Sequence, residues 1–165
     1  MVSSAAISAL QQQLAEQHPQ LPLITPSDPN FEATRLCFVR RDAVPSAIAR
    51  PQNAEDVQAL VRYCTANSID FVVRGGGHDC AGRSQVDGAL SIDLRDIKYV
   101  NISGDKKTAS IGGGILFRDL AKELDAQELV TPMLVLIRFP SATLTPQPQT
   151  PQPRHVMLTL SPANC

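Results

Sequence analysis

The chain carries one dense run of glycine, Val73-Arg74-Gly75-Gly76-Gly77-His78-Asp79-Cys80-Ala81-Gly82-Arg83-Ser84. It follows residues 69–73, whose β-branched and aromatic side chains predict a strand. Three successive glycines carry no Cβ, which lets backbone N–H groups turn toward one point and lets a bulky anion approach the main chain. The run therefore predicts a strand that ends in a loop able to bind a phosphate or diphosphate; a tight turn without a ligand is the alternative.

Two common phosphate-binding motifs do not describe this loop. Residues 77–84 nearly satisfy G-x-x-x-x-G-K-S/T, but Arg83 replaces the lysine, and a P-loop must open a helix. Here a turn at residues 87–88 and an alternating strand follow instead. The dinucleotide fingerprint G-x-G-x-x-G fails because, counted from Gly75, Cys80 stands where the last glycine belongs. A P-loop phosphotransferase is therefore a distant alternative.

His78 closes the glycine run and is the candidate reactive side chain. Neutral imidazole is a competent nucleophile, so covalent attachment to an electrophilic cofactor is chemically reasonable; a structural histidine is the alternative. Arg74 and Arg83 flank the run and would add positive charge near a bound anion. His18 and His155 lie in the two ends of the chain, and no carboxylate cluster surrounds His78, so the sequence indicates no metal site.

The segments on either side of the loop predict an α+β fold. A strand over residues 47–50 precedes a helix that begins at the N-cap Asn53 and ends near Asn67, with one apolar stripe. Three further strands are predicted over residues 90–94, 99–102 and 108–111. A second glycine cluster, residues 112–114, then opens another amphipathic helix. Strands grouped in this way are typical of an α+β unit and not of a regular βαβ array.

The composition limits the chain to one ordinary domain. Its 165 residues carry 15 Lys and Arg against 16 Asp and Glu, which argues against a nucleic-acid or membrane-surface binder. The four cysteines form no CxxC pair, so neither a zinc ribbon nor a disulfide framework is indicated. We find no secretory signal and no apolar run of about 18 residues, so the expected location is cytoplasmic by default.

The two ends of the chain are expected to lie outside the core. Residues 1–17 predict a short helix, whereas four prolines in residues 18–30 argue against regular structure, which makes residues 1–39 a lead-in. Residues 141–165 are rich in Pro, Gln and Thr with one charge, Arg154, and predict disorder. The whole Pro/Gln-rich tail is placed at residues 133–165, and a natural Pro-rich linker or partner-binding tail is the alternative for residues 141–165.

Four segments together resemble a known family. Residues 47–51, 53–57, 73–79 and 92–94 resemble the start of the FAD-binding domain of FAD-linked oxidases of the vanillyl-alcohol oxidase superfamily. The nearest relatives by this resemblance are the berberine-bridge-enzyme-like and 6-hydroxynicotine-oxidase-like flavoproteins. The resemblance covers about residues 40–132 and implies the first subdomain of a PCMH-type FAD-binding domain, followed by a disordered tail.

The resemblance also implies a cofactor and its site. In that family the corresponding loop binds the FAD pyrophosphate through backbone amides, and the histidine at the position of His78 is in many members joined to the 8α carbon of the flavin. The cofactor-binding candidates are therefore Arg74, Gly75, Gly76, Gly77, His78, Asp79 and Gly82. Family chemistry is the oxidation of a small-molecule alcohol or amine, or an oxidation that forms a C–C bond.

The chain departs from the family pattern after Pro132. Family members continue there into further flavin-contacting stretches and a substrate domain, whereas residues 133–137 are a bare apolar run that leads into the Pro/Gln-rich tail. We therefore expect an amino-terminal fragment of a flavin oxidase, with half of a cofactor site and no catalytic residues of its own. A non-catalytic fragment that binds flavin or a partner through its uncovered apolar surface is the alternative.

Overall fold

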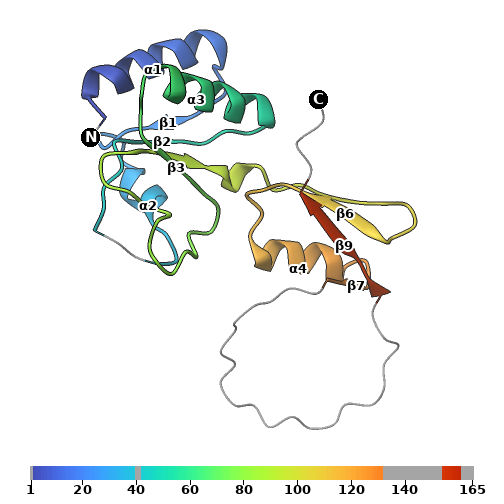
Figure 1. Ribbon diagram of the computed structural model, residues 1–165. Helices are drawn as coiled ribbons and strands as arrows, with labels where there is room; N and C mark the ends of the chain where they lie inside the picture. Colours follow the sequence, from blue (N-terminus) through green and yellow to red (C-terminus); the bar gives the residue numbers. More distant parts are fainter. Residues whose placement is uncertain (1, 40–41, 132–153, 161–165) are drawn as a thin grey trace.

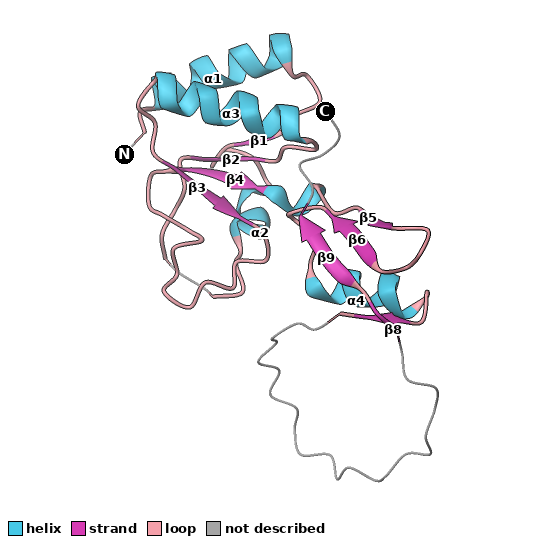
Figure 2. Cartoon of the chain, turned by 45° about the vertical axis from the view of Figure 1, so that its right-hand side comes forward, coloured by secondary structure: helices cyan, strands magenta, loops and turns pink. Residues whose placement is uncertain are grey.

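A computed structural model describes residues 2–39, 42–131 and 154–160 of the chain. These residues form three sheets and two apolar cores, and the two larger sheets organise the fold (Figure 1). The larger unit is a four-stranded sheet with two helices on one face, and the smaller is a three-stranded sheet that packs against one helix (Figure 1, Figure 2). The predicted α+β class is confirmed.

The larger sheet has the strand order β1-β2-β4-β3. Its strands are β1 (Leu23–Ile24), β2 (Ala47–Ala49), β3 (Phe71–Arg74) and β4 (Leu90–Asp93). Strands β2, β4 and β3 run parallel, and β1 pairs antiparallel with β2. The carboxyl ends of the three parallel strands therefore meet at one edge of the sheet, where ligands of such sheets usually bind.

Helices α1 (Ser4–Gln17) and α3 (Ala54–Ala66) lie side by side over the larger sheet (Figure 1, Figure 2). The predicted start of α3 is confirmed, because the Asn53 side chain accepts a 2.9 Å hydrogen bond from the Asp56 N–H. Leu60 and Cys64 are fully buried on its inner face. Burial also raises the pKa of the Cys64 thiol to about 11, so this cysteine stays protonated near neutral pH.

The amino end of the chain is part of the core, so its description as a lead-in is wrong. Leu10 on α1 is fully buried, and Leu21 is 6% exposed. Strand β1 also forms inside the proline-rich segment, because the prolines flank Leu23–Ile24 and leave both residues free to pair. A short helix, α2 (Phe31–Arg35), follows it.

The smaller unit joins the larger one through a 3₁₀ turn, η1 (Leu94–Asp96). Its elements are β5 (Val100–Ile102), β6 (Thr108–Ile111), α4 (Phe117–Asp125), β7 (Leu129–Val130), β8 (Arg154–His155) and β9 (Met157–Leu160). Strand β6 pairs antiparallel with β5 and parallel with β9, while β7 pairs with β8. None of the helices among residues 2–39, 42–131 and 154–160 has the length and apolar character needed to cross a membrane.

The predicted disorder of the tail is wrong for residues 154–160, which form β8 and β9. Val156 is 1% exposed, Leu158 packs against the core of the smaller unit, and the Met157 N–H donates to the Lys107 carbonyl at 2.8 Å. A composition averaged over the whole tail hides this short apolar run. Residues 133–153 and 161–165, which include the apolar run at 133–137, lie outside the described residues.

Candidate functional site

Residues 75–79, the glycine loop, leave the carboxyl end of β3 at the edge where the parallel strands meet. A second segment, residues 36–39, lies against this loop, and we call it the strap. The Phe38 N–H donates to the Gly76 carbonyl at 3.4 Å, and the Val39 N–H donates to the Gly77 carbonyl at 3.1 Å. The carbonyls of Gly76 and Gly77 therefore face the strap and accept hydrogen bonds from it.

The same hydrogen bonds orient the amides of the loop. In a trans peptide the N–H points away from the carbonyl of the same plane, so the N–H groups of Gly77 and His78 face away from the strap. Within the part of the chain that the structure describes, no N–H group of residues 75–79 has an acceptor. Successive amides that face one side in this way form an anion-binding concavity.

Close packing explains why two of the three positions are glycine. Gly77 has φ +70°, and a Cβ there would lie 2.6 Å from the Cys37 Cβ. A Cβ on Gly76 would lie 2.7 Å from Cδ2 of His78. A Cβ on Gly75 would meet only the Gly113 carbonyl oxygen, at 3.7 Å, which is ordinary contact. The loop thus has a compact, donor-lined form that is suited to an anionic group.

The His78 side chain is exposed beside these amides. Its imidazole stacks on the Phe38 ring, with the ring centroids 4.3 Å apart and the planes 20° from parallel. The Phe38 side chain is itself 74% exposed. The predicted reactive side chain is therefore exposed and directly follows the predicted anion-binding glycines in the chain.

Arg74 does not lie where its predicted contribution of positive charge would need it. Its guanidinium turns into the interior, where it donates to Asp93 at 2.9 Å and to the Arg35 carbonyl at 2.7 Å. Only 3% of the residue is exposed. The reason is strand alternation, which places Arg74 on the face toward α2, so its side chain anchors the start of the strap and not a ligand.

Asp93 is the centre of a buried ion triad with Arg74 and Arg95. Its carboxylate is fully buried and also accepts from Nε of Arg95 at 2.9 Å. Burial by itself raises the pKa of Asp93, but the Arg95 hydrogen bonds and both guanidinium charges outweigh it, so the pKa lies below its usual value. The alternation of β4 predicts a half-buried strand, yet Ser91 and Asp93 are as buried as their neighbours, and the triad was missed for that reason.

Asp79 and Gly82 shape the far end of the loop. The Gly82 N–H donates to the Asp79 carbonyl at 2.8 Å, and Gly82 has φ +72°. The Asp79 carboxylate accepts from the N–H of Arg83 at 2.6 Å and from its guanidinium at 2.8 Å. These hydrogen bonds hold the pKa of Asp79 well below its usual range. Arg83 is thus paired within the turn.

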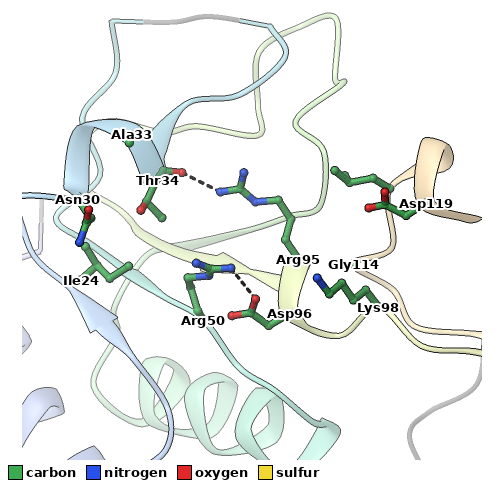
Figure 3. A pocket seen from close by; sticks show the side chains of 11 residues that line it. Ile24, Asn30, Ala33, Thr34, Arg50, Arg95, Asp96, Lys98, Gly114 and Asp119 are labelled. Carbon is green, nitrogen blue, oxygen red and sulfur yellow. Dashed lines mark hydrogen bonds and ion pairs between the residues drawn. The ribbon is translucent and has the colours of Figure 1, made fainter.

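A polar pocket of about 520 Å³ adjoins the loop (Figure 3). It lies between α2, the end of β2, η1 and the start of α4, with an ion pair between Arg50 and Asp96 and a hydrogen bond from Arg95 to the Thr34 carbonyl (Figure 3). Leu116 forms a wall shared with the loop, because its Cδ2 lies 3.3 Å from the Cβ position of Gly76. No local sequence pattern indicates this pocket, since its lining comes from distant segments.

The fold that carries this loop is that of a known family of cofactor-binding domains. Residues 45–143 match the family described as the FAD binding domain, and the chain belongs to this family. FAD is its cofactor, and the expected resemblance is confirmed.

Individual relatives agree with this assignment. The chain is 37% identical over 119 residues to the FAD-linked oxidoreductase aurO of Gibberella zeae, a match that covers 72% of this chain and 24% of aurO. The crystal structure of 6-hydroxy-D-nicotine oxidase from Arthrobacter nicotinovorans is 37% identical, with a TM-score of 0.61, over 65% of this chain and 24% of that enzyme. The BBE-like 1 protein of Physcomitrella patens is 30% identical, with a TM-score of 0.57, over 64% and 23%. The chain thus spans about a quarter of the length of these relatives.

Proposed function

We propose that this chain is the FAD-binding part of an FAD-linked oxidoreductase and that the glycine loop binds the FAD diphosphate. This proposal depends mainly on the amides of residues 75–79, none of which has an acceptor among the described residues, and on the Gly77 and His78 N–H groups, which face away from the strap. Two N–H groups, those of Gly77 and His78, would donate to the phosphate oxygens, and charge-assisted hydrogen bonds of this kind are strong. The packing of Gly77 against Cys37 would keep the loop in this form.

The exposed imidazole of His78 is the proposed point of covalent attachment to the 8α carbon of the flavin. The bond would join one imidazole nitrogen to that carbon, with loss of the N–H hydrogen of the imidazole and one C–H hydrogen of the flavin methyl group. These two protons and two electrons would reduce dioxygen, the oxidant, to hydrogen peroxide, so atoms and electrons balance. The exposure of the ring and its position beside the amides support this assignment.

The proposed reaction of the whole protein is the oxidation of a small molecule. Bound FAD supplies the two-electron acceptor for that reaction. The residues of this chain bind and orient the cofactor, and we assign none of them as the catalytic base. The names of relatives, such as 6-hydroxy-D-nicotine oxidase, support the class of reaction and not a particular substrate.

The test compares FAD with riboflavin, which has the same ring system and no diphosphate. Equilibrium dialysis of the flavin-free chain should give an affinity for FAD at least about tenfold above that for riboflavin, because only FAD reaches the loop amides. His78→Ala should still bind FAD but should release all of it on acid precipitation. Equal affinities, or no uptake of either flavin, would contradict the proposal. Uptake of FAD without oxidation of any substrate would favour the alternative of a non-catalytic fragment. Hydrolysis of ATP would favour the alternative of a P-loop phosphotransferase.

A further inference from the structure

We propose that Phe38 is a positioning residue for His78, and that its ring holds the imidazole plane so that a ring nitrogen faces the flavin. This inference rests on the proposed function of the loop. It assigns a role to a side chain that the motif does not contain, since Phe38 lies far from residues 73–84 in the sequence.

The two rings are fixed to one scaffold. Their centroids are 4.3 Å apart and their planes 20° from parallel, which is a stacked arrangement. The N–H of Phe38 donates to the Gly76 carbonyl, two residues before His78, so the backbones that carry the two rings are hydrogen-bonded to each other. The backbone positions from which the two rings project are therefore tied to each other.

The strap that carries Phe38 is itself anchored in the interior. Arg74 donates to the Arg35 carbonyl at 2.7 Å and to Sγ of Cys37 at 3.1 Å, and its guanidinium is held by buried Asp93. The Cys37 Cβ also packs directly against Gly77. The position of Phe38 is therefore determined by the buried ion triad and not by the surface alone.

The high exposure of the Phe38 side chain is unusual for an aromatic residue. At 74% it is more exposed than any other large hydrophobic side chain in the described part of the chain. A phenyl ring in water is unfavourable by its apolar area, and the stack on His78 is its one ring contact among the described residues. Restraint of the imidazole gives this exposed ring a function.

Stacking suits a nucleophilic imidazole because it leaves the reacting atom free. The lone pair of an imidazole nitrogen lies in the ring plane, so a phenyl ring on one face restricts rotation without covering the nitrogen. Gly76 leaves room for this ring position, since a Cβ there would lie 2.7 Å from Cδ2 and 2.9 Å from Nε2 of His78. The imidazole is thus limited on one face by Phe38, and it occupies space that a side chain at position 76 would fill.

The test uses Phe38→Leu, which keeps apolar bulk and removes the flat ring, and Phe38→Tyr, which keeps the ring. Phe117→Leu is the matched control, because Phe117 is also a partly exposed aromatic, at 40%, and lies on α4 of the smaller unit. Circular dichroism and the thermal midpoint verify that each variant is folded. In flavin-free protein, the His78 ring protons should show an upfield ring-current shift in NMR spectra, which Phe38→Leu abolishes and the other two variants retain.

FAD is then added, and total bound flavin is measured separately from acid-stable flavin over time. Phe38→Leu should bind total FAD within about twofold of the parent chain but form the acid-stable product at least about tenfold more slowly, because a misoriented nucleophile reacts less often. Phe38→Tyr and Phe117→Leu should match the parent chain in both measurements.

The outcomes separate this inference from the proposed function. An unchanged rate in Phe38→Leu, or the lack of an upfield shift in the parent chain, overturns the role of Phe38 while the diphosphate site stands. A fall in total FAD binding with an unchanged rate per bound flavin also overturns it, since Phe38 would then be a ligand contact. A parent chain that binds FAD but never forms acid-stable flavin overturns the covalent link, and the role of Phe38 with it.

Discussion

The two glycine clusters have the same composition, but their amides have opposite roles. In residues 112–114, the N–H of Gly112 donates to the Tyr99 carbonyl and that of Gly114 to the Ile97 carbonyl, both at 2.9 Å. In residues 75–77, no N–H has an acceptor within the described ranges. The first pattern joins backbone segments, and the second leaves donors for a ligand. What distinguishes a binding loop is therefore the destination of its amides and not its glycine content.

The neighbours of the two clusters also differ in kind. Added Cβ atoms at Gly112 and Gly114 would meet backbone carbonyl groups, at 2.3 Å from Ile97 and 1.5 Å from Leu94. At Gly76 and Gly77 they would meet the side chains of His78 and Cys37. Backbone cannot yield without disturbing the fold, whereas side chains can. Gly112 and Gly114 should thus tolerate substitution less well than Gly76 and Gly77.

Gly114→Ala should have the largest effect. The added methyl would overlap the Leu94 carbonyl oxygen, so the segment before α4 must shift, and we expect a loss of more than about 3 kcal/mol in the free energy of unfolding. Urea denaturation measures it. Gly113→Ala is the control, because its Cβ would meet only Cδ1 of Leu94 at 3.7 Å, and it should be nearly neutral. Equal effects of the two substitutions would show that the close approach of the Leu94 carbonyl to Gly114 does not determine the loss of stability.

Asp93→Asn should come next, at about 3 kcal/mol, because it leaves Arg74 and Arg95 without their buried counter-ion. The folded-state pKa of Asp93 lies below its unfolded value, so its contribution to stability is present above the ordinary Asp pKa of about 3.9 and is lost as pH falls through the lower folded value. Urea midpoints between pH 7 and pH 2 should therefore fall more for the parent chain than for the variant. Parallel curves would show that the triad is not the acid-sensitive element.

Gly77→Ala should cost about 2 kcal/mol, since the residue combines φ +70° with close contact to Cys37. It should also weaken FAD binding, because the two outward amides depend on this backbone conformation. Thermal unfolding and equilibrium dialysis measure the two effects. Gly104→Ala, where nothing lies within 4 Å of the added Cβ, controls for a general effect of replacing glycine.

Gly75→Ala should have the smallest effect on folding, at most about 0.5 kcal/mol in either direction, because the site is open and the unfolded chain loses freedom. The same urea experiment checks it. A loss as large as that of Gly77→Ala would mean that the loop tolerates no added side chain, and the distinction between its three glycines would fail.

Local patterns in the sequence predict much of this molecule. The capping residue Asn53, the alternation over residues 90–94 and the glycine run each act over a few neighbouring residues, and each has its predicted place in the fold. The same is true of the family, whose motifs are short and ordered.

Contacts between distant segments account for what the sequence did not predict. The strap meets the glycine loop through hydrogen bonds that join Phe38 and Val39 to residues nearly forty positions away, and no periodicity signals them. The alternation of residues 90–94 predicts an exposed side chain for Asp93, but the fold buries it in contact with Arg74 and Arg95. The pocket in Figure 3 is built from segments that only the tertiary fold unites.

The pairing of β9 with β6 has a consequence for the order of folding. The strands and helices of the larger unit all lie between residues 4 and 93, so this unit can form while later residues are still on the ribosome. Strand β6 instead receives its parallel neighbour from residues 157–160, across a long intervening segment, and such non-local pairing is slow. During synthesis the nascent chain should therefore pass through a stage in which one half is native and the other waits for its last strand.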